Sequence, residues 1–251
     1  MYDPPGYLWA IIIAGVTAIP AATCVVLYGG AVRGGAGRTR AALLAVGAAV
    51  VLGSWFTASA VIAGHGWYHT RLGHGVPWMP VAVIGFFGLL LGLRRIPVVA
   101  RALAAPGTAS RLELPHSFRA IEGTAFLILM GLGHLPALFA LPAGLGDIAA
   151  GIAAPLVAAR LAQGGGRRAA LWHNAFGMTD LIVALTLGTL TGFQLVNVTP
   201  SGSLISELPL ALIPTAAVPL LFALHVTSVP ALARTPRTPR PATAPLTAAA
   251  S

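Results

Sequence analysis

Seven long apolar stretches, separated by short polar connections, constrain this 251-residue chain more than any other feature. They cover residues 7–28, 41–63, 77–96, 120–139, 144–162, 169–192 and 208–232. Each is close to the roughly 20 residues that an α-helix needs to cross a hydrocarbon core about 30 Å thick. Hydrophobic residues make up 57% of the chain and charged residues only 8%, against roughly a quarter charged in soluble domains. The sequence therefore predicts an all-α membrane protein, a bundle of seven transmembrane helices.

The basic residues predict how this bundle is oriented. All fifteen are arginines, and all but Arg71 follow the first, third, fifth or seventh apolar stretch, on one side of the bundle. Because positive loops are retained in the cytoplasm, we expect the N-terminus outside and the C-terminus inside. The net charge of +9 then reflects topology and contact with anionic lipid headgroups, and not nucleic-acid binding.

The composition also indicates the source of the chain and the end of its membrane domain, and it excludes one class of seven-helix protein. A lysine-free chain rich in Ala, Gly and Pro is typical of a GC-rich bacterial gene, which places it in the bacterial cytoplasmic (inner) membrane. Residues 1–232 form one transmembrane domain, and the Pro/Thr/Ala/Arg-rich residues 233–251 are expected to be a disordered cytoplasmic tail. A retinal protein needs a lysine amine for its Schiff base, so the lack of lysine excludes that class.

Ionisable residues within the apolar stretches are the main candidates for function, because burying a charge in lipid is costly. Asp180 is the deepest carboxylate, about 16 Å from the inner end of its stretch at ~1.5 Å per residue. His173 precedes it by two helical turns on the same face. Arg119 and Glu122, at i,i+3 spacing, suit pairing with each other or with an acid on a neighbouring helix. The expected intramembrane polar cluster is Arg119, Glu122, His173, Asn174, Asp180 and His225.

A second candidate group lies toward the outer side. His65 and His69 follow the second stretch, and we place His134 in the outer half of the fourth helix and Asp147 near the outer start of the fifth. Histidines with a carboxylate suit zinc, copper or iron, although glycines around His65 and His69 favour a solvated loop. Haem is an alternative cofactor, held by His134 with His173 or His225, although the unequal depths of these histidines count against either pair. The main expectation is that the protein holds no cofactor, with haem or a transition metal as the alternatives.

Part of the chain resembles a known group of proteins. The segment LPALFALPAGLGDIAAGIAAP at residues 135–155 is similar to a group of uncharacterised bacterial polytopic integral membrane proteins. The resemblance continues through Trp172, Asn174, Gly177 and Asp180, and through LIPTAAVPLLFALH at residues 212–225. It covers roughly the carboxyl-terminal half, implies a membrane fold and supplies no reaction.

Three functions remain open at this point. The main hypothesis is transport or sensing of a small solute or proton through the polar cluster around Asp180. The first alternative is a haem- or metal-binding membrane oxidoreductase subunit, and the second is an accessory subunit without chemistry of its own. No catalytic motif is present, which favours a non-enzymatic role. The GxxxG pairs Gly88/Gly92 and Gly188/Gly192 fit packing within the bundle or, alternatively, a homo-oligomer or membrane complex.

Overall fold

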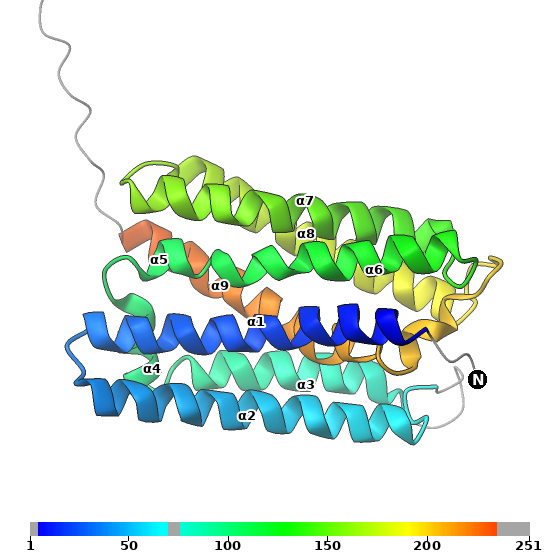
Figure 1. The fold of residues 1–251 in the computed structure, drawn as a ribbon, viewed down its shortest axis with the longest axis horizontal. Helices are drawn as coiled ribbons and strands as arrows, with labels where there is room; N and C mark the ends of the chain where they lie inside the picture. The colour runs from blue at the N-terminus through cyan, green and yellow to red at the C-terminus, as the bar shows by residue number, and fades with distance from the viewer. Residues whose placement is uncertain (1–4, 70–75, 235–251) are drawn as a thin grey trace, which may run out of the picture.

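In the computed structural model, which describes residues 5–69 and 76–234, all regular secondary structure is helical (Figure 1). This confirms the predicted all-α class. The longer helices are α1 (Gly6–Arg33), α2 (Arg38–Gly64), α3 (Trp78–Leu93), α6 (Arg119–Gly131), α7 (Ala137–Ala162), α8 (Arg167–Gly192) and α9 (Val218–Arg234). The short ones are α4 (Pro97–Ala104), α5 (Thr108–Arg111), the 3-10 helices η1 (Leu114–Phe118) and η2 (Gly202–Ser206), and the π-helical turn η3 (Ile213–Ala217). Arg71 and the expected tail beyond Arg234 lie outside the described residues.

Within residues 5–69 and 76–234, five helices are long and apolar enough to cross a membrane: α1, α2, α7, α8 and the continuous run of η3 with α9. The bent pair α3 and α4, with 82° between its two helices, would make a sixth. At 13 residues α6 is too short to qualify by itself. However, η1 leads directly into it, and together they run beside α1 along most of the bundle (Figure 1).

The boundary between α6 and α7 differs from the prediction. The helix expected over residues 120–139 ends at Gly131, and α7 begins at Ala137, seven residues before the expected start at 144. Gly133 adopts a φ of 77°, a left-handed conformation that terminates a helix, and Pro136 stands at the N-cap of α7. His134 therefore lies in the turn between the two helices and not within a helix.

The segment after α3 is more than a connection. Instead of joining two spans at the membrane surface, it forms α4 and α5 and then enters the bundle as η1, which packs against α1 and α7. Glu113 and His116 are fully buried as a result. Side chains that the sequence placed in a loop thus lie among the helices.

The α9 helix lies at the centre and its neighbours surround it. It packs against α3 and α8, while α7 lies between α6 and α8, and α1 contacts α2 and α6 (Figure 1). The π turn η3 contains Pro214 and ends two residues before Pro219, so the regular α-helix of this element begins only at Val218. The outward faces remain apolar, with exposed Val25, Leu43 and Ile84 among many others.

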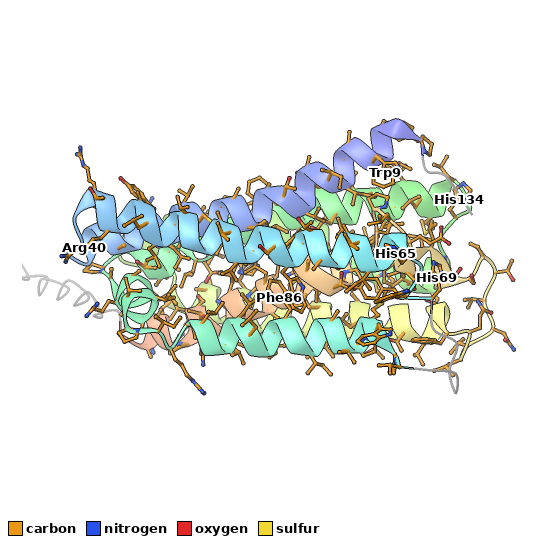
Figure 2. All side chains as sticks on the ribbon, turned by 90° about the horizontal axis from the view of Figure 1, so that it is seen from below. Trp9, Arg40, His65, His69, Phe86 and His134 are labelled. Atoms are coloured by element: carbon orange, nitrogen blue, oxygen red, sulfur yellow. The ribbon has the colours of Figure 1, made fainter. Side chains whose placement is uncertain are left out.

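The two ends of the bundle carry different residues. Figure 2 shows Arg40 at one end and Trp9, His65, His69 and His134 at the opposite end. We refer to these as the Arg40 end and the His65 end.

The two glycine pairs have different surroundings. At Gly188 and Gly192, on α8, a methyl group would contact Phe139 or Gly202, so this pair packs inside the bundle. At Gly88 and Gly92, on α3, the surroundings are open.

Candidate functional site

Polar side chains gather midway along the bundle, around the central helix α9. Four of the six acidic residues in the sequence are buried there, with one arginine and three histidines. They come from α6, α7, α8, α9 and from η1 with the residue before it, so only the folded bundle brings them together. We call this set the central cluster, and its members are Glu113, His116, Arg119, Glu122, Asp147, His173, Asn174, Asp180, His225 and Ser228.

Arg119 holds the middle of the central cluster. Its side chain is fully buried, and its Nε donates a hydrogen bond to Asp147 Oδ1 at 2.7 Å. One terminal nitrogen donates to Asp180 Oδ2, and the other lies 3.4 Å from His225 Nε2. The planar guanidinium presents its donors as a fixed fork, so it can bind partners from three helices at once. One positive charge therefore faces two carboxylates.

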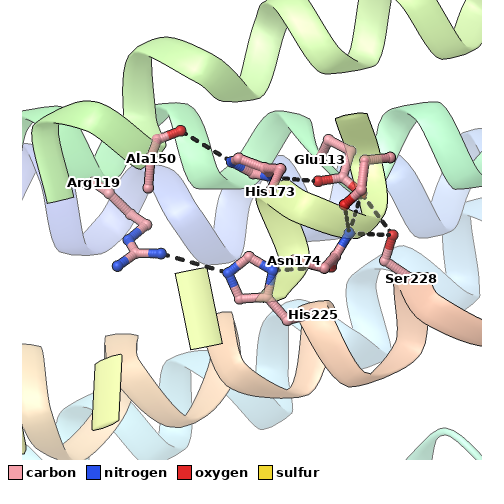
Figure 3. A network of polar contacts seen from close by, with 8 residues as sticks. Glu113, Arg119, Ala150, His173, Asn174, His225 and Ser228 are labelled. Carbon is pink, nitrogen blue, oxygen red and sulfur yellow. Dashed lines mark hydrogen bonds and ion pairs between the residues drawn. The ribbon is translucent and has the colours of Figure 1, made fainter. Parts of the chain in front are cut away.

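A chain of hydrogen bonds leads from Arg119 toward η1 (Figure 3). His225 Nδ1 donates to the Asn174 side-chain oxygen at 3.0 Å, and Asn174 Nδ2 donates to Glu113 Oε1 at 2.9 Å. The Ser228 hydroxyl donates to the same carboxylate oxygen at 2.6 Å. The other oxygen, Glu113 Oε2, lies 2.7 Å from His173 Nδ1. Glu113 thus connects side chains from α8 and α9.

The Glu113–His173 pair shares a proton. His173 Nε2 lies 3.1 Å from the carbonyl oxygen of Ala150, which can only accept, so this nitrogen carries a hydrogen. The facing Nδ1–Oε2 contact then needs a further proton, which sits either on the imidazole or on the carboxyl group. In both cases the pair is neutral overall. The excess negative charge of the central cluster therefore resides around Arg119.

Close approach of the backbone makes this arrangement possible. Gly146 on α7 lies against the Asp180 carboxyl group, and Gly177 on α8 lies against the imidazole of His225. A Cβ atom at either position would overlap those groups. Glycine is needed at both positions because any side chain would push the polar groups apart.

Two members of the central cluster lack hydrogen bonds within the described part of the chain. Both ring nitrogens of His116 are unpaired there, although its ring stacks on His225 with centroids 3.8 Å apart. Glu122 Oε1 is likewise unpaired, and its side chain lies against Gly15 of α1. Arg119 therefore pairs with acids on neighbouring helices and not with Glu122. An unpaired buried polar group costs about 1–3 kcal/mol, so its retention marks these residues as functional candidates.

A cavity of about 840 Å³ reaches the central cluster from the His65 end. Its walls come from α3, α7, α8 and η3, and Asp147 lies at its inner limit. Asp147 is ten residues into α7, about 15 Å from the helix start at ~1.5 Å per residue. His69, Gln194, Ser203 and Ser206 line the opposite part.

The group expected at the outer side is not a single site. His65 follows the last residue of α2 and bonds the Val61 carbonyl at 2.8 Å, so it does not share a helical face with His69. His69 lies 3.8 Å from Glu207. The expected position of Asp147 beside these histidines is wrong, because α7 starts earlier than predicted and carries Asp147 to Arg119.

The described residues contain no group of three or more His, Cys, Asp or Glu arranged to hold a metal ion. Both ring nitrogens of His173 and of His225 already have hydrogen-bond partners. His134 lies at the His65 end, away from both (Figure 2). The geometry therefore does not favour the haem pairs considered from sequence.

Sequence reasoning missed Glu113, His116 and Ser228. Glu113 carried a usable signal, since it is the one acid in the arginine-rich segment 97–119, and a buried carboxylate can hold several donors. His116 and Ser228 have no distinctive local pattern. The structure brings Arg119, His173, Asn174, Asp180 and His225 together and adds these three with Asp147.

Comparison with known protein families gives a match over most of the bundle. Residues 76–233 match the family described as a domain of unknown function (DUF8737). This region contains the whole central cluster and most of the cavity wall, whereas α1 and α2 lie before it. No curated protein and no solved structure matches the chain.

Proposed function

Because the chain belongs to the DUF8737 family, whose description states no activity, we propose its function from the site itself: proton-linked transport or sensing of a small solute by an integral membrane protein. The observation that carries this proposal is Arg119, buried midway along the bundle, which binds Asp180 and also Asp147 at the inner limit of a large cavity.

We place the bundle in a bacterial inner membrane with seven spans, the N-terminus outside and the C-terminus in the cytoplasm. Three features support this placement. The outward helix faces are apolar, the run of η1 and α6 supplies the remaining span, and Arg40 lies at the end opposite His65 (Figure 2). Exposed Trp67 and Trp78 near the His65 end suit a membrane interface. The Arg40 end would then contact anionic lipid headgroups.

Charge balance links the central cluster to protons. Arg119 supplies one positive charge for Asp147 and Asp180, and the Glu113–His173 pair is neutral. Glu122 is buried without a cationic partner and is therefore counted as neutral. With both aspartates ionised, the group then carries one uncompensated negative charge in a medium that penalises it. Binding a proton or a cationic solute removes that charge. The two are therefore expected to compete for the same place, which is the basis of coupling.

The routes that lead to the central cluster also suit this function. The cavity connects the His65 end with Asp147, while the hydrogen-bond chain through His225 and Asn174 extends from Arg119 to Glu113, the residue before η1. The π turn η3 lines the cavity at Ile213 and Pro214, and π-helical turns are frequent at functional sites. A movement of α9 would change both the cavity and the chain of hydrogen bonds.

The test is infrared difference spectroscopy of the protein in liposomes, comparing mildly acidic with mildly alkaline buffer. We expect a carboxyl protonation band that is lost in Asp180→Asn and shifted in Asp180→Glu. Glu207→Gln, which removes a carboxylate outside the central cluster, is the matched control and should retain the band. A wild-type spectrum without any carboxyl change in the central cluster would overturn the proton linkage.

A further inference from the structure

We propose that the cavity binds a small amphipathic monocation, with a protonated amine against Asp147 and an apolar body between α3 and α8. This inference rests on the proposed function, because it names the class of solute.

The size and the walls suit an organic molecule. At about 840 Å³ the cavity falls within the range of roughly 300–1,000 Å³ typical of small-molecule sites. Apolar side chains form most of the wall midway along it, among them Phe126, Phe139, Leu181, Leu185 and Val218. A hydrated inorganic ion would leave these surfaces facing water, whereas an alkyl or aromatic group would cover them.

Asp147, at the inner limit of the cavity, selects the charge of the ligand. Asp147 Oδ1 accepts from Arg119, but its Oδ2 makes no hydrogen bond within the described part of the chain. No arginine is among the described residues that line the cavity. Asp147 therefore offers a free acceptor, next to a group with one excess negative charge. A protonated amine supplies the donor and the missing positive charge, and a carboxylate or phosphate would be repelled.

The cavity also opens sideways. Ile84 of α3 lines the cavity and yet is 69% exposed, and Thr189 of α8 also lines it and is exposed. Ile84 lies six residues into α3, about 9 Å from the helix start at ~1.5 Å per residue. The opening is thus on the flank of the bundle and not at its tip. In the proposed orientation it faces the outer leaflet, where amphipathic molecules concentrate.

The experiment is isothermal titration calorimetry of the full chain in lipid nanodiscs with three matched probes: 4-phenylbutylamine, 4-phenylbutanol and 4-phenylbutyrate. They share a body and carry a positive, neutral or negative end. We expect the amine to bind at one per chain, about tenfold or more tighter than either analogue, the factor that one charge-assisted hydrogen bond supplies away from bulk water.

Two variants locate the site. Gly188→Leu adds a side chain to the cavity wall where ordinary packing space exists, and it should abolish binding. Gly53→Leu places the same side chain on an open, exposed face of α2 and should bind like wild type. Asp147→Asn should remove the preference for the amine. Equal binding of the three probes, or amine binding that survives Gly188→Leu, would overturn the proposal.

Protons released on binding separate this inference from the proposed function. Titration in phosphate and in Tris, which differ in ionisation enthalpy, measures how many protons leave when the amine binds. Proton release that occurs in the wild type and disappears in Asp180→Asn supports both the ligand class and proton linkage. Amine binding without proton release keeps the ligand class and contradicts proton linkage. No amine binding, with an intact carboxyl band in the infrared test, refutes the ligand class and leaves proton linkage standing.

Discussion

Replacing Arg119 with methionine removes the buried guanidinium and leaves Asp147 and Asp180 without their shared partner. Methionine is long, flexible and apolar, so it fills much of the same space without a charge. The side chain is fully buried, which means that water cannot take over its hydrogen bonds. The substitution therefore tests whether the central cluster is held together by charge.

The expected loss in the free energy of unfolding follows from the two ion pairs that Arg119 makes with Asp147 and Asp180. At an effective dielectric constant of about 20, unit charges about 4 Å apart attract by about 4 kcal/mol, so two pairs give about 8 kcal/mol before opposing effects. Repulsion between the carboxylates and the desolvation of all three groups offset much of this. Removing one partner of a buried pair typically costs about 3–5 kcal/mol. We expect Arg119→Met to lower the free energy of unfolding by that amount.

The assay is equilibrium unfolding in mixed micelles, with a compensating variant as the control. In Arg119→Met combined with Asp147→Asn and Asp180→Asn, no charge is left unpaired, and neutral replacement of a buried ion pair costs little. We expect the triple variant to recover most of the lost free energy of unfolding. Arg119→Met within about 1 kcal/mol of wild type, or a triple variant no better than the single one, would refute the reasoning.

Three further predictions concern packing and hydrogen bonding. Gly146→Ala should cost about 1–3 kcal/mol because its methyl group overlaps the Asp180 carboxyl. Gly53→Ala, on an open face of α2, should stabilise by up to about 1 kcal/mol in the same unfolding assay, because alanine is the better helix former. His116→Phe should raise the free energy of unfolding by about 1–3 kcal/mol, because it keeps the ring stacked on His225 and removes two unpaired nitrogens. A loss of stability would show instead that these nitrogens are paired in the membrane. Glu113→Gln should lower the free energy of unfolding by about 1–3 kcal/mol, because one amide nitrogen replaces an acceptor; unchanged stability together with an unchanged infrared band would argue against the chain of hydrogen bonds.

Local pattern predicted the helices well and their ends less well. Apolar runs located α1, α2, α3 and α8 to within a few residues, because the length and composition of a run are properties of that run alone. The turn at residues 132–136 was missed, since it lies within an apolar run and depends on the backbone conformation at Gly133. That error displaced His134 and Asp147 and produced an outer metal site that the structure does not assemble.

The sequence by itself determined the helical class, the asymmetry of the arginines and the unusual depth of Asp180, because hydropathy and charge are read residue by residue. The tertiary structure alone decided which polar groups meet. Asp147 joins Arg119, and Glu113 enters the bundle to bond Asn174, only because η1 packs between α1 and α7 and α9 lies at the centre. Periodicity assigns a face to each helix but does not order the helices around one another. Contacts between helices depend on that order, so they become visible only once the chain is folded.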